Sequence, residues 1–66
     1  MIHYFKKDFI VLKVDFSAKK YSFYIILTTK SHEENLDLPN FWDYKYIIDL
    51  GYKRISKQEY ESWEEI

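Results

Sequence analysis

The sequence predicts an α+β fold in which a small antiparallel sheet of about three strands is covered on one face by a C-terminal helix. Two alternating apolar runs, over residues 9–16 and 21–29, predict strands, and a helix-start signature at Ser56 predicts the helix. The chain has 66 residues, which is room for a single domain spanning 1–66. Its seven Tyr, five Phe and two Trp supply the concentrated core that so small a domain needs.

The two alternating runs predict a β-hairpin. The even-numbered positions from Ile10 to Phe16 are apolar, as are the odd-numbered positions from Tyr21 to Leu27, and a polar loop of four residues separates the runs. A register with Phe16 opposite Tyr21 brings apolar residues together on one face. That register pairs Val14 with Phe23, Leu12 with Ile25, and Ile10 with Leu27.

The middle of the chain is harder to interpret. We expect residues 31–40 to form a loop, with one capped helical turn over 31–34, because Pro39 disfavours regular structure around it. For residues 41–50 we favour a strand, since Tyr, Trp and Ile dominate and the even-numbered positions are apolar. The alternative is a short helix that Asn40 caps and Gly51 ends.

The C-terminal segment carries the clearest helix signal. Ser56 and Glu59 have the spacing of a capping box, so we expect a helix from about Lys57. Tyr60 and Trp63 lie three apart and share one face, which predicts that docking of these rings on the sheet holds the helix. Ile55 and Tyr60 can pack as a hydrophobic staple.

A second apolar face of the hairpin is the predicted partner-binding site. One helix covers one face of the sheet, which leaves an apolar patch that would mark an interaction site if exposed. The patch comprises Phe9, Val11, Tyr24 and Ile26, with Ile47 at its margin. Two alternatives remain open: the patch is covered by the segment 2–5 or the loop 31–41, or it forms a groove for a small ligand.

Composition favours a non-catalytic protein-interaction module over an enzyme. The chain has no Cys, two His and one Gly, so thiolate metal sites and glycine-rich phosphate loops are excluded, and we expect no metal, cofactor or catalytic residue. The absence of Cys fits a reducing cytoplasm, and no apolar run is long enough to span a membrane. The expected partner is a protein or a second copy of the chain. The expected module is a phage-type inhibitor or a homodimeric adaptor. Usage rich in Lys, Tyr and Ile is associated with AT-rich bacteria and their phages.

Charge asymmetry supplies two further hypotheses. Residues 1–30 have a net charge of +4 and residues 31–66 a net charge of −5. Lysines beside aromatic rings suit single-stranded nucleic acid, which is the alternative function. Its candidate residues are Lys6, Lys7, Lys13, Lys19, Lys20 and Tyr24. On the acidic side, the glutamates of the C-terminal helix could contact a basic partner.

Overall fold

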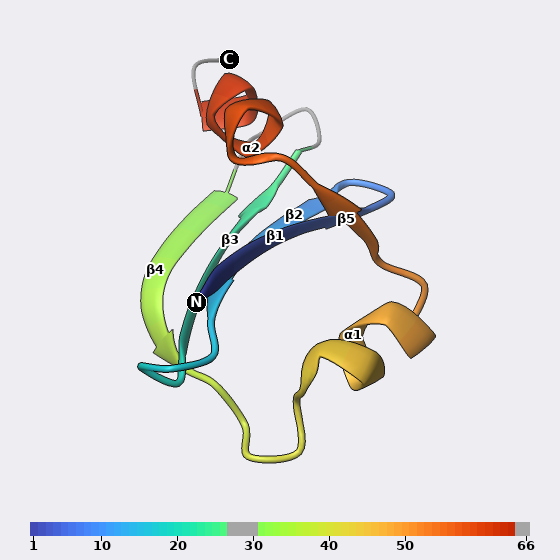
Figure 1. Ribbon diagram of the computed structural model, residues 1–66. Helices are drawn as coiled ribbons and strands as arrows, with labels where there is room; N and C mark the ends of the chain where they lie inside the picture. The colour runs from blue at the N-terminus through green and yellow to red at the C-terminus, as the bar shows by residue number, and fades with distance from the viewer. Residues whose placement is uncertain (27–30, 65–66) are drawn as a thin grey trace.

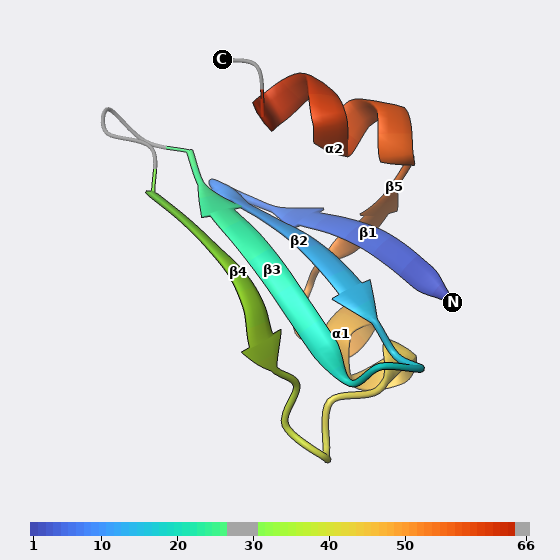
Figure 2. The same cartoon turned by 90° about the vertical axis from the view of Figure 1, so that its left-hand side faces the viewer.

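A five-stranded antiparallel sheet lies between two short helices (Figures 1 and 2). The structure, a computed structural model, describes residues 1–26 and 31–64. The strand order is β4-β3-β2-β1-β5. The elements are β1 (Ile2–Lys7), β2 (Ile10–Asp15), β3 (Lys20–Ile25), β4 (Ser31–Asp37), α1 (Tyr44–Asp49), β5 (Lys53–Ile55) and α2 (Lys57–Glu64). The α+β class and the antiparallel sheet are therefore confirmed, whereas the sheet has more strands than predicted and helices on both of its faces.

The predicted hairpin is present as β2 and β3, but its register differs by two residues. Val14 lies opposite Tyr21 and Leu12 opposite Phe23. The four-residue turn begins at Phe16 because the Asp15 carboxylate accepts hydrogen bonds from the backbone N–H groups of Ser17, at 3.0 Å, and Ala18, at 3.1 Å. A shift of two residues keeps every side chain on its predicted face. The predicted pairing of Ile10 with Leu27 is replaced by Ile10 with Ile25, and residues 27–29 lie outside the described residues.

The turn therefore yields a stability prediction. Replacing Asp15 with Ala removes both turn hydrogen bonds, so we expect the free energy of unfolding to fall by about 1 kcal/mol. Urea denaturation followed by tryptophan fluorescence measures the change. Lys13→Ala, at an exposed position of the same strand, is the control and should have less than half of that effect. An equal loss in both variants would contradict the role given to the carboxylate.

Three strands were not predicted. β1 pairs with β2 across the two-residue turn Asp8–Phe9, in which Asp8 adopts a φ of 50°. The segment 31–37 forms the edge strand β4 rather than the predicted loop with a helical turn, and its pairing with β3 is irregular near Asn35, whose φ is 56°. The short strand β5 pairs with β1 at the other edge. These strands lack the Asn-Gly turn signal and the regular apolar alternation that mark strands in a sequence.

The segment 41–50 contains a helix, so the favoured strand interpretation was wrong and the alternative was correct in kind. Asp43, not Asn40, is the N-cap: its carboxylate accepts a hydrogen bond of 2.8 Å from the backbone N–H of Tyr46. Gly51 follows the last turn with a φ of 105°, which favours glycine. The Tyr- and Ile-rich composition suits strands in isolation, but the caps at both ends determine the local structure here.

Helix α2 begins where the capping signal predicts. The Ser56 hydroxyl accepts a hydrogen bond of 3.0 Å from the backbone N–H of Glu59. Tyr60 is buried, with its ring centroid 5.2 Å from that of Tyr4 and 5.5 Å from that of Tyr24. Ile55 and Trp63 pack against the same cluster. The docking of α2 through its aromatic face is therefore confirmed.

The two faces of the sheet carry separate hydrophobic clusters. Under α2 lie Val11, Tyr24 and Tyr60. The opposite face carries Phe5, Leu12 and Val14, which pack with Leu38 and with Ile47 from α1. The C-terminal helix thus covers the face that was predicted to be open, because β5 leads the chain to that side of β1, and α1 covers the face that α2 was expected to cover.

Candidate docking surface

The five residues predicted to bind a partner do not form one exposed surface. Val11 and Tyr24 are buried under α2, and Ile26 packs at the edge of their cluster. Ile47 is buried on the opposite face of the sheet. Phe9, in the β1–β2 turn, is the member that stays exposed, at 59%. The expected exposure of this patch was wrong because α2 docks on this face rather than on the opposite one, and because Ile47 lies in a helix that turns it into the other cluster.

Exposed apolar side chains gather instead on α1 and the residues beside it. Among the described residues, seven large apolar side chains are exposed, and four of these lie between residues 41 and 50. They are Phe41, 64% exposed, Tyr44 and Leu50, each 40% exposed, and Ile48, 36% exposed. We call these four side chains the α1 surface. Such a concentration in one short segment is typical of an interaction site.

Helix α1 carries apolar side chains on two sides and a polar crest between them. Ile47 points into the core, and at 100° per residue Tyr44 and Ile48 lie on one side of it, while Tyr46 lies on the other. Phe41 folds back against Tyr46, with ring centroids 5.3 Å apart and ring planes at 86°. Lys45 and Asp49 form the crest, with Nζ and Oδ2 3.5 Å apart. The residue patterns did not indicate this arrangement, but the helix cap at Asp43 is a signal in the sequence from which it follows.

Rings from the sheet fix the α1 surface from beneath. The Tyr44 ring lies 5.3 Å from the His3 ring and 5.6 Å from the Phe5 ring, measured between centroids. On the other flank, Trp42 packs against Tyr21 at 5.5 Å and against Tyr46 at 6.2 Å. A partly buried aromatic ring therefore supports each side of α1. Because the exposed side chains are already held in place, they lose less conformational entropy when a partner binds.

His3 lies at the centre of the contacts beneath Tyr44. Its ring packs against Phe16 at 5.5 Å, and the buried Nδ1 atom makes no hydrogen bond to any described residue. Desolvation lowers the pKa of His3 below its usual value of 6.5, and the positive charges of Arg54 and the N-terminus lower it further. The neutral imidazole is therefore the form that this site favours.

The lowered pKa of His3 predicts a loss of stability in mild acid. Below pH 6.5 the unfolded chain binds a proton at His3 that the folded chain resists, so the stability present above pH 6.5 falls as the pH decreases through the lowered pKa. Thermal unfolding between pH 8 and pH 5 measures the effect. His3→Phe should flatten the pH dependence, because a phenyl ring keeps the packing without the titration. An unchanged pH dependence in that variant would show that other groups are responsible.

The residues of the nucleic-acid hypothesis are spread over the molecule. Tyr24 is buried and stacks on His32, with ring centroids 3.9 Å apart, so its face is not open to a base. Lys6 and Lys7 point to opposite faces of the sheet, as neighbours on a strand do. Lys13 lies on the face of Lys6, while Lys19 and Lys20 are in or beside the β2–β3 turn, where Lys20 pairs with Asp37 at 2.5 Å. Lys13 and Lys20 line one hollow beside this turn, together with Asp15, whereas Lys7 lies on the opposite face and Lys6 lies toward the other end of the sheet. The five lysines therefore do not form one continuous surface.

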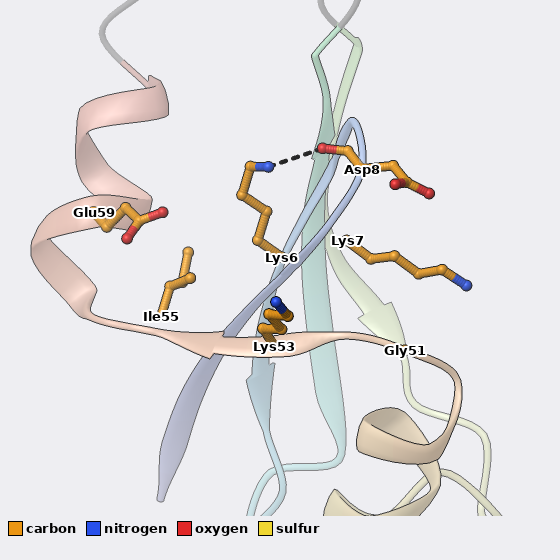
Figure 3. Close-up of a pocket in the computed structure, with 7 residues that line it drawn as sticks. All are labelled: Lys6, Lys7, Asp8, Gly51, Lys53, Ile55 and Glu59. Atoms are coloured by element: carbon orange, nitrogen blue, oxygen red, sulfur yellow. Dashed lines mark hydrogen bonds between the residues drawn. The ribbon is translucent and has the colours of Figure 1, made fainter.

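A hollow of about 480 Å³ lies between the N-terminal half of α2, β5 and the end of β1 (Figure 3). Lys6 and Lys53 are directly opposite on the paired strands, an unfavourable contact of like charges. Lys6 Nζ donates a hydrogen bond of 3.0 Å to the Asp8 carbonyl, and Glu59 contributes a negative charge to the lining. The lining combines three lysines with the carboxylates of Asp8 and Glu59, so charges of both signs border this hollow.

Neither a cluster of metal-ligating side chains nor a similarity to known proteins indicates a further site among the described residues. Within 1–26 and 31–64, no group of three His, Asp or Glu side chains is arranged to hold a metal ion. Over the same residues, neither helix is long and apolar enough to cross a bilayer. No protein-family model, curated protein or solved structure matches the chain.

Proposed function

We propose that the protein is a non-catalytic interaction module that docks on a partner protein through the α1 surface. One observation supports this proposal: four exposed apolar side chains lie on or beside a single helix, and packed rings beneath that helix hold it in place. The four are Phe41, Tyr44, Ile48 and Leu50. Burial of this apolar area would contribute about 25 cal/mol per Å² before the costs of association. The proposal keeps the predicted class of function and moves the site from the hairpin face to α1.

The shape of the surface favours a groove on the partner. Ile47 faces the core and Lys45 and Asp49 lie opposite to it, so a groove that receives the apolar side chains on both sides of α1 would place Lys45 and Asp49 at its floor. An inhibitor that occupies the groove of a target would use α1 in this way. A homodimeric adaptor would instead pack α1 against a second copy of itself.

Two exposed phenylalanines allow a matched test. Phe41 is 64% exposed beside α1 and Phe9 is 59% exposed in the β1–β2 turn, so replacing either with Ala should leave the fold intact. Proteins retained from a bacterial lysate at high salt by the wild-type chain should be lost with Phe41→Ala and kept with Phe9→Ala. The opposite pattern would assign docking to the β1–β2 turn. Equal retention by both variants, together with an unchanged oligomeric state, would refute the proposal.

Salt dependence separates this proposal from binding of single-stranded nucleic acid. Docking of apolar flanks should depend weakly on salt, whereas contacts of lysines with phosphates weaken steeply because counterions are displaced. Titration of a labelled oligothymidine into the protein at low and high salt measures the second mode directly. We expect no saturable binding at physiological salt, because the candidate lysines are divided between both faces of the sheet, Lys20 pairs with Asp37, and Tyr24 is buried.

A further inference from the structure

A notch on the α1 flank has the chemistry to receive a cationic side chain. It has a volume of about 220 Å³ and is lined by Phe41, Asp43, Lys45, Tyr46 and Asp49. The rings of Phe41 and Tyr46 meet nearly at right angles and form two of its walls. A cation placed over such a ring is attracted by the negative face of the π system. The two rings therefore favour a positively charged side chain over a purely aliphatic one.

Two carboxylates lie on the same side of α1 as these rings. Asp43, Tyr46 and Asp49 are three residues apart, so they form a stripe along one side of the helix. Asp43 is held in place by its capping bond to the Tyr46 N–H, and its carboxylate retains lone pairs for a second donor. Asp49 is 63% exposed and its pairing with Lys45, at 3.5 Å, is long and solvated, so a better donor can replace it. The two carboxylates outnumber the one lysine in the lining.

We propose that this notch receives an arginine side chain from the partner protein, an inference that rests on the proposed docking through α1. A guanidinium is planar, so it can stack on the Phe41 or Tyr46 ring while its N–H groups donate to the Asp49 carboxylate. A lysine ammonium would satisfy the charge without the stacking. The partner's contact segment is therefore apolar with an arginine within it, the apolar residues contacting Phe41 and Leu50.

The inference is testable without knowledge of the partner. The probe is the peptide acetyl-Gly-Leu-Arg-Leu-Gly-amide, titrated against the wild-type chain while NMR follows the ring protons of Phe41 and Tyr46. We expect saturable shifts with a dissociation constant in the millimolar range. The same peptide with citrulline, a neutral isostere of arginine, should bind about fivefold more weakly, and the lysine peptide should fall between the two. Equal binding of the arginine and citrulline peptides would overturn the inference.

Two isosteric variants locate the site. Asp49→Asn should reduce the preference for the arginine peptide over the citrulline peptide, whereas Asp8→Asn, in the β1–β2 turn, should leave it unchanged. An unaltered preference in Asp49→Asn would also overturn the inference. If the peptide fails to bind while Phe41→Ala still abolishes capture of a partner, docking through α1 stands and the arginine assignment fails. If the peptide binds but capture does not depend on Phe41, the notch stands and the proposed docking fails.

Discussion

Replacement of Tyr60 with Ala should unfold the protein or leave it only marginally stable. Tyr60 is buried between the rings of Tyr4 and Tyr24 and is the central side chain by which α2 covers the sheet. Truncation of a buried aromatic residue costs about 3–5 kcal/mol. A core of this size rarely supplies more than about 3–5 kcal/mol of net stability, so the two quantities are comparable. Urea denaturation and the near-UV circular dichroism of the aromatic rings measure the loss.

Glu61→Ala is the matched control for that experiment. Glu61 is exposed and adjacent to Tyr60 in α2, so the substitution tests the helix without touching its buried face. We expect a change within about 0.5 kcal/mol. If Tyr60→Ala were also that mild, α2 would contribute little to the fold, and the Val11 and Tyr24 face would be available to a partner after all.

Replacement of Ile48 with Glu should abolish docking without unfolding the chain. Ile48 is 36% exposed on the flank of α1, so a carboxylate can reach water in the free protein. In the complex the same carboxylate would be buried against an apolar groove without a partner charge, which is costly. We expect a loss of at least about 2 kcal/mol, or roughly 30-fold in the dissociation constant. Calorimetry with the captured partner measures this change.

Gln58→Glu controls for the added charge. It introduces the same single negative charge at an exposed position of α2, on the other side of the sheet from α1. The affinity should change less than about twofold, because exposed charges away from an interface are screened. Comparable weakening in both variants would indicate a general electrostatic effect rather than docking by α1.

Sequence patterns revealed the elements that have local, self-contained signals. The β2–β3 hairpin follows from alternation, and α2 follows from its capping box and its paired rings. The hairpin register was wrong by two residues because it depended on a hydrogen bond of the Asp15 side chain that alternation does not encode. β5 depends on pairing with β1, which lies about fifty residues away in the sequence, so no local pattern indicates it. β1 pairs with its neighbour β2, but their turn lacks the Asn-Gly signal of a hairpin.

The expected exposure of the hairpin patch was wrong for a related reason. The exposure of Val11 and Tyr24 depends on which sheet face the C-terminal helix covers, and the route of β5, rather than α2 itself, determines that face. The helix α1 was only the alternative interpretation because its Tyr and Ile residues favour strands, while its start is determined by one side-chain cap at Asp43. Once α1 is recognised, the exposure of Ile48 and Leu50 follows from the position of Ile47 in the core.

Hydroxyl-radical footprinting of the captured complex tests docking through α1 most directly, because aromatic side chains report their own exposure. In the free chain Phe41, Tyr44 and Phe9 should all be labelled, since each is exposed. In the complex, labelling of Phe41 and Tyr44 should fall sharply while that of Phe9 is unchanged. Protection of Phe9 with continued labelling of Phe41 and Tyr44 would contradict the account and move the docking site to the β1–β2 turn.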